Sequence, residues 1–239
     1  MKTSSKSIIT FCIGSLLMIS FKAFPQDPLT PEEAGQLHTR ITEIAYGKLQ
    51  EWRANEYSLN QALNELYNDV FLNEFSNLSG FSSTEISDFM EVQMGLTQEN
   101  IGAWDGYNIN IGDTSRSALF EDIIEIVSGL PVPTAYLSQM QLLVTEYSDQ
   151  IPAEELQTIV EISNSSYLYW FTNFNNWITA ASPTSYGCQK DKVVGGDIRG
   201  AIGGFLASAW SGLGAIGGAV TGAMVGTLVG AVEAAFACK

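Results

Sequence analysis

Apolar residues between positions 27 and 182 recur every three or four residues, which is the period of an amphipathic α-helix. One clear stripe follows Pro31 and consists of Leu37, Ile41, Ile44, Leu49 and Trp52. Another follows Ser58 and consists of Leu59, Leu63, Leu66, Val70 and Phe71. Convincing alternation of apolar and polar residues is missing, and only residues 107–111 are a candidate for a short extended piece. The pattern therefore predicts a mainly α fold.

Capping signals place the starts of several of these helices. A Ser or Thr followed three residues later by Glu or Gln forms a capping box, in which each side chain satisfies a backbone N–H group of the other residue. Three such pairs stand at expected helix starts: Thr30 with Glu33, Ser58 with Gln61, and Ser82 with Glu85. Further helices are expected over about 115–128, 134–147 and 153–178, with Gly or Pro between them. Residues 102–114 are rich in Gly and Asn and are expected to form a loop.

A dense aromatic run lies in the last of these helices. It begins at Tyr167, and Trp170, Phe174 and Trp177 fall on one helix face. Aromatic side chains supply much of the buried area of a protein core, so this face is predicted to pack inside the domain. The alternative is a surface that receives the C-terminal tail.

The C-terminal tail has a different pattern, in which small residues recur every four positions in two registers. The first register is Gly196, Gly200, Gly204, Ser208 and Gly212. The second register is Gly214, Gly218, Gly222, Gly226 and Gly230. The two registers mirror each other about Leu213, and the segment 200–232 carries no charge. A chain that folds back at Leu213 sets each small residue opposite another.

The mirrored registers predict a hairpin of two helices in close backbone contact, with residues 211–215 forming the bend. The same reflection carries Cys188 onto Cys238. Two cysteines in an exported chain are expected to form one disulfide, and here it would close the open end of the hairpin. The rival geometry is a continuous helix, which would hold the two cysteines about 75 Å apart and exclude an intrachain disulfide.

Glycine disfavours a helix by about 1 kcal/mol per position relative to alanine, so the tail needs a compensating interaction. Close helix–helix contact in a membrane provides one, because small residues let the backbones approach each other. The tail is therefore expected to bind a lipid bilayer or to self-associate. The alternatives are a soluble hairpin buried against the helical domain, and a disordered or processed segment.

The N-terminus resembles a secretory signal peptide. Lys2 and Lys6 precede an apolar stretch from Ile8 to Phe21, which is short for a membrane span. Residues 1–25 are therefore predicted to be a signal peptide, and the protein is predicted to be exported, secreted, periplasmic or part of the cell envelope. An uncleaved anchor is the alternative.

Charge and composition favour no enzymatic function. The chain has a formal net charge of −15, which argues against binding to nucleic acid. His38 is the one histidine, and the cysteines lack the spacing of a zinc site. The loop 105–113 gathers oxygen ligands but lacks the EF-hand spacing. The sequence therefore predicts no catalytic residue, metal, cofactor or small-molecule substrate.

The segments 193–204 and 217–223 resemble the glycine-zipper segments of class II bacteriocin-like peptides. That resemblance covers roughly the last 45 residues and implies insertion into target membranes and their permeabilisation. Gly195-Gly196 also resembles the double-glycine site after which such peptides are cut from their leaders. Cleavage there would discard Cys188, so this processing and the disulfide are competing hypotheses.

Together these features predict an exported, mainly α protein with an acidic all-helical domain over 26–182 and a glycine-zipper hairpin tail over 183–239. The expected function is membrane insertion or self-association through the tail. Its most specific version is bacteriocin-like permeabilisation of a membrane. The alternative is a non-enzymatic structural or interaction protein of the cell envelope, anchored by the hairpin.

Overall fold

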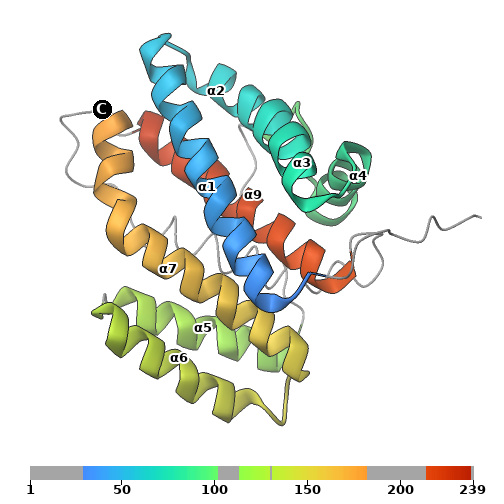
Figure 1. Cartoon of the computed structure of the whole chain (residues 1–239), viewed down its shortest axis with the longest axis vertical. Coiled ribbons are helices and arrows are strands. Elements are labelled where there is room, and N and C mark those ends of the chain that lie inside the picture. Colours follow the sequence, from blue (N-terminus) through green and yellow to red (C-terminus); the bar gives the residue numbers. More distant parts are fainter. Residues whose placement is uncertain (1–28, 102–112, 130, 182–213, 238–239) are drawn as a thin grey trace, which may run out of the picture.

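A computed structural model describes residues 29–101, 113–129, 131–181 and 214–237. Within these residues the chain is helical and contains no strand, which confirms the mainly α prediction (Figure 1). The elements are α1 (Pro31–Ala54), α2 (Leu59–Glu65), the π-helix η1 (Leu66–Phe75), α3 (Ser76–Ser79), α4 (Ser83–Met94), α5 (Thr114–Ser128), α6 (Pro133–Tyr147), α7 (Ala153–Ala181) and α9 (Gly214–Ala237). The predicted signal peptide 1–25 and residues 102–112, which include the candidate extended piece, lie outside the described residues.

All three predicted capping boxes are present at helix starts. At α1 the Thr30 hydroxyl accepts from the Glu33 backbone N–H at 3.2 Å, and the Glu33 carboxylate accepts from the Thr30 backbone N–H at 2.8 Å. The pairs at the starts of α2 and α4 have the same reciprocal geometry. At α5 the N-cap is Asp113, whose carboxylate accepts from the Arg116 backbone N–H at 2.9 Å. Asp113 therefore caps α5 and does not belong to the loop that was expected over 102–114.

The segment after Ser58 departs from the predicted α-helix. It is α-helical only to Glu65 and continues as the ten-residue π-helix η1. The reason lies in the spacing of Leu66, Phe71 and Phe75, which are five and four residues apart and are all fully buried. The i→i+5 hydrogen bonds of a π-helix bring residues at this wider spacing onto one face, whereas an α-helix would rotate them apart.

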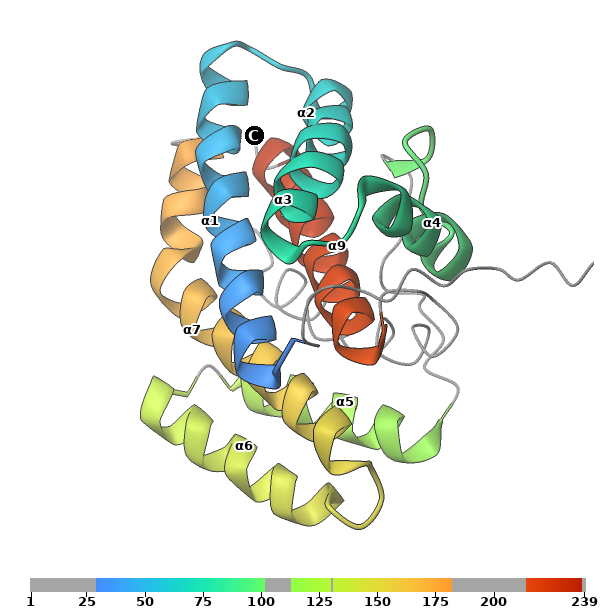
Figure 2. The same ribbon diagram turned by 45° about the vertical axis from the view of Figure 1, so that its right-hand side comes forward.

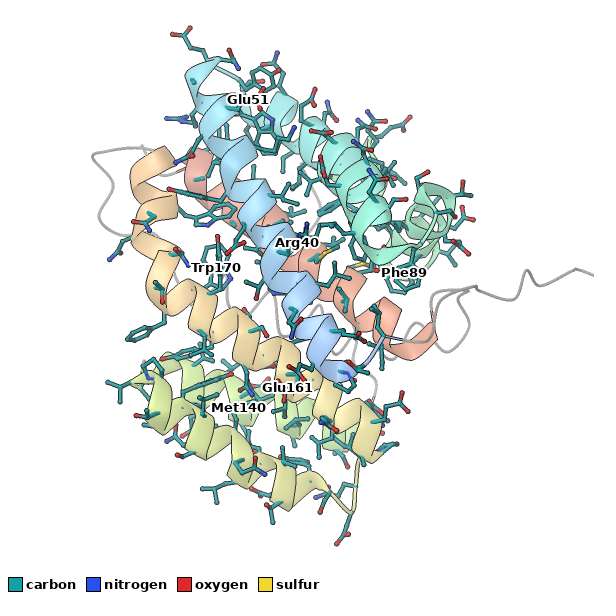
Figure 3. The ribbon with its side chains drawn as sticks, in the orientation of Figure 1. Arg40, Glu51, Phe89, Met140, Glu161 and Trp170 are labelled. Carbon is teal, nitrogen blue, oxygen red and sulfur yellow. The ribbon has the colours of Figure 1, made fainter. Side chains whose placement is uncertain are left out.

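Helices α1 and α7 form the most extensive helix pair, and they lie side by side in both ribbon views (Figure 2). Gly35 allows their closest approach, since a Cβ built there would lie 2.5 Å from the Ser165 Oγ and 3.0 Å from the Glu161 carbonyl oxygen. Further along the pair, the aromatic run packs in the interface. The rings of Trp170 and Trp177 are 5.1 Å apart, and Trp170 lies between α7 and α1 (Figure 3). The predicted core role of these two residues is confirmed, with Trp170 0% and Trp177 2% exposed.

Replacing Gly35 with alanine is expected to lower the free energy of unfolding by about 1–3 kcal/mol, because the added methyl group would press on the α7 backbone. Gly47 is the matched control on the same helix. It is exposed, and a Cβ there would meet nothing within 4 Å. Gly47→Ala should therefore stabilise the protein by up to about 1 kcal/mol through helix propensity alone. Urea unfolding measures the stability of both variants. Equal changes in the free energy of unfolding would contradict the close approach of α1 and α7.

Helices α5 and α6 form a separate hairpin that packs on α7 (Figures 1 and 2). The rings of Tyr136 on α6 and Tyr167 on α7 stack with centroids 3.9 Å apart. The Tyr167 hydroxyl also donates to the Pro131 carbonyl oxygen at 2.5 Å. At the other end, Arg116 on α5 forms a two-pronged ion pair with Glu155 on α7. These contacts fix the hairpin to α7 at two points.

A candidate membrane-active helix in the core

The second glycine register lies entirely on α9. This helix begins at Gly214, directly after the mirror point Leu213, and its first charged residue is Glu233. Its 24 residues give a length of about 36 Å. The segment Ile216–Glu233 is long and apolar enough to cross a membrane by length and composition. The expected bend over 211–215 is wrong for its last two residues, since Gly214 and Ala215 are helical.

In the fold, α9 is a central helix of the domain. Helices α1 and α7 make its largest contacts, and α2, η1 and α4 cover it from the other side (Figures 1 and 2). Within the segment Ile216–Glu233, 89% of the residues are buried. Large side chains on every side of the helix are covered, including Met224, Leu228 and Phe236. A helix that is apolar around its whole circumference needs such enclosure in water.

The glycines of α9 differ in their surroundings. Gly218, Gly222 and Gly226 are buried, whereas Gly230 is partly exposed. A Cβ added at Gly230 would meet no atom within 4 Å, so no close backbone approach is found there. The first register, Gly196, Gly200, Gly204 and Gly212, lies outside the described residues, as do Cys188 and Cys238. The hairpin and its disulfide therefore stay predictions.

Two hydroxyl groups interrupt the apolar surface of α9. The Thr221 hydroxyl donates to the Gly217 carbonyl oxygen at 2.8 Å, which is the usual arrangement for a threonine inside a helix. Thr227 is also 0% exposed, but its hydroxyl has no hydrogen-bond partner among the described residues. Neither threonine stood out in the sequence.

Two charged residues of α1 contact two neighbouring helices, α9 itself and η1, which is one of the helices that enclose it. Near the end of α1, the Arg53 guanidinium lies 5.1 Å from the centre of the Phe236 ring on α9, which is a cation–π contact. One turn earlier, the Lys48 Nζ and the Asp69 Oδ2 are 2.5 Å apart and join α1 to η1. The hydrogen bond between them lowers the pKa of Asp69 below its usual 3.8 and raises the pKa of Lys48 above its usual 10.5. Both pairings were missed in the sequence, because their members are far apart along the chain.

The Lys48–Asp69 pair predicts a pH dependence of stability. Because the folded-state pKa of Asp69 is lowered, its contribution is complete above about pH 3.8 and is lost as the pH falls through the folded-state pKa. Because the pKa of Lys48 is raised, its contribution is complete below about pH 10.5 and is lost as the pH rises further. Asp69→Asn should lower the free energy of unfolding at pH 7 by up to about 1 kcal/mol, since the pair is partly exposed.

Denaturant unfolding from pH 7 to pH 2 checks this, with Asp149→Asn on the exposed turn after α6 as the control. The difference between the wild-type protein and D69N should vanish at low pH, and the control should show no difference at pH 7. A D69N difference that persists at pH 2 would show that the effect has another origin.

Residues of α5 and α6 line an open groove of about 490 Å³. Its acidic lining comprises Asp122, Glu125 and Glu146. The Tyr147 hydroxyl donates to the Asp122 carboxylate at 2.6 Å beside it, and burial together with that bond raises the pKa of Tyr147. Among the described residues, no group of three or more His, Cys, Asp or Glu side chains is placed to hold a metal ion.

Comparison with known proteins adds no assignment to this geometry: no protein family, curated protein or solved structure matches the chain. The candidate site therefore rests on its own physical features, which are an apolar glycine-rich helix, its enclosure, and the charged contacts that close the enclosure.

Proposed function

We propose that this is an exported protein that keeps α9 buried in water and releases it into a lipid bilayer, which permeabilises the target membrane. One observation carries the proposal: α9 is apolar on all sides, carries no charge before Glu233, and has a length of about 36 Å. That length exceeds the ~30 Å hydrocarbon thickness of a bilayer. The resemblance of the tail to class II bacteriocin-like segments supports the same function.

Transfer of α9 from the protein core into lipid costs the helix itself little free energy. Burial of apolar surface is favourable by about 25 cal/mol per Å² whether protein or lipid removes it from water. The helix therefore exchanges one apolar surrounding for another, and its backbone hydrogen bonds are satisfied within the helix in both. What opposes release is the exposure of the inner faces of α1, α7 and the segment α2–α4. The stability of this enclosure is expected to control the rate of release.

The inner faces of the enclosing helices suit a membrane surface once α9 has left. The buried side of α1 carries an apolar stripe, which consists of Leu37, Ile41, Ala45, Leu49 and Trp52, with the buried His38 and Thr42 beside it. The opposite side of α1 is polar and exposed. An amphipathic helix of this kind binds the boundary between lipid headgroups and acyl chains. The formal charge of −15 favours zwitterionic over anionic lipid, since an anionic surface repels an acidic chain.

The experiment adds the purified protein to dye-loaded phosphatidylcholine vesicles under oxidising and reducing conditions. Leakage is expected, and its rate should follow the stability of the α1–α7 interface. Gly35→Ala should accelerate leakage and Gly47→Ala should slow it, because the first loosens the enclosure and the second tightens it. Vesicles rich in phosphatidylglycerol should leak more slowly at neutral pH. The absence of leakage from every vesicle type, with the Gly35→Ala variant included, would contradict the proposal.

A non-enzymatic structural or interaction protein of the cell envelope is the second candidate. The length and apolarity of α9 favour this function as much as permeabilisation, because one such helix suffices as a permanent anchor. In that case the protein would remain with the membrane fraction after alkaline washing and would release no dye. Neither function assigns a catalytic role to any residue.

A further inference from the structure

Two positions on α9 are not explained by its packing in the helical domain. Thr227 is fully buried, and its hydroxyl has no hydrogen-bond partner in the part of the chain that the structure describes. At Gly230, three residues further on, an added Cβ would meet no atom within 4 Å, so the fold does not require a glycine. Both features disfavour the fold in water, because a buried unpaired hydroxyl is destabilising and glycine is a poor helix former.

The unpaired hydroxyl belongs to an arrangement that suits helix–helix contact. Residues four apart on a helix form a row, and Thr227 is part of a row of small buried residues: Ala219, Ala223, Thr227 and Ala231. Gly230 lies beside Thr227 and Ala231 at the next position around the helix. A row of small residues lets a second helix approach closely, and a hydroxyl within it can bond to that helix. Thr221, whose hydroxyl is already bonded to Gly217, needs no such partner.

We propose that in the membrane α9 pairs with α9 of a second copy of this chain through this row, with the Thr227 hydroxyl donating across the contact. This inference rests on the proposed membrane insertion and names the partner of the inserted helix. A second copy fits because it presents the same smooth, uncharged row, and a two-fold contact makes such a surface self-complementary.

The test uses the full chain in phosphatidylcholine vesicles. Separate batches carry amine-reactive donor and acceptor dyes, energy transfer between them measures association, and vesicle flotation measures insertion. Thr227→Val keeps the shape of the side chain and removes the hydroxyl. It should reduce the association constant roughly 3- to 20-fold, the range expected for one hydrogen bond between membrane helices, with insertion unchanged. The matched control Thr221→Val should associate as the wild-type protein does.

A second variant and a solution measurement separate this role from a merely structural one. Gly230→Leu places a large side chain in space that is open in the water-soluble fold, so it should fold normally and still lose association. In water, Thr227→Val should unfold at the same or a higher denaturant midpoint, because the hydroxyl it removes is unpaired.

Two failures are distinguishable. Insertion of all variants with equal association of the wild-type protein and T227V would overturn the pairing and leave membrane insertion standing. Failure of the wild-type chain to float with vesicles would overturn the proposed function and, with it, the pairing.

Discussion

Deletion of α9 is expected to abolish cooperative folding of the remaining helices. A chain that ends at Leu213 would expose the inner faces of α1, α7 and the segment α2–α4 at once, since all of them pack on α9. Loss of so much apolar contact exceeds the marginal stability of a domain, which is about 5–15 kcal/mol. The truncated chain should keep helical far-ultraviolet circular dichroism, lose its near-ultraviolet signal, and bind the dye ANS.

A graded version of this prediction uses a single side chain. Leu228 on α9 is 0% exposed, and its replacement by alanine should cost about 2–5 kcal/mol of stability through lost burial and a cavity. Leu142 on α6 is 68% exposed and provides the matched control. Leu142→Ala should change the stability by less than about 0.5 kcal/mol. Urea unfolding measures both variants, and a stable, cooperative truncated chain or a neutral Leu228→Ala would show that α9 is dispensable for the soluble fold.

The second large effect is expected at Arg116. Its guanidinium donates to both carboxylate oxygens of Glu155 at 2.5 Å, and Glu155 is only 2% exposed. Arg116→Ala would leave that carboxylate buried without a counter-charge, which typically costs about 3–5 kcal/mol.

The double variant Arg116→Met with Glu155→Leu tests whether stability is lost because the ion pair is gone or because the Glu155 carboxylate is left buried and unpaired. It should be much more stable than Arg116→Ala, because replacing both partners by apolar groups leaves no charge uncompensated. Chemical denaturation at pH 7 measures the wild-type protein, Arg116→Ala and the double variant. A double variant as unstable as Arg116→Ala would show that the ion pair itself, and not the orphaned carboxylate, accounts for the loss.

Local features of this fold were predictable because their causes are local. Each capping box needs two residues three positions apart, and Thr30 with Glu33 forms one as the sequence indicates. The burial of Trp170 and Trp177 followed from their shared helix face. The π-helix was missed because Leu66 with Val70, and Phe71 with Phe75, are each four residues apart, which is also the spacing of an α-helix.

The location of α9 was not predictable in the same way. A helix that is apolar on every side can bury its surface equally well in lipid or in a protein core. Its sequence alone therefore does not decide between the two surroundings. Arg116 is the one Lys or Arg residue between positions 54 and 187, but nothing local in the sequence identifies Glu155 as its partner. The unpaired hydroxyl of Thr227 is visible only when the surroundings of α9 are known.

The central claim is that α9 moves from the protein core into lipid, and a depth probe on α9 tests it most directly. Gly230→Cys, in a chain that lacks residues 1–25 and has Cys188 and Cys238 replaced by serine, places a single NBD fluorophore at a partly exposed position with open space. Phosphatidylcholine vesicles with and without a quencher on the acyl chains are then added. We predict that the emission shifts to the blue and is quenched by the acyl-chain quencher. Unchanged emission without quenching, from protein that floats with the vesicles, would contradict the account.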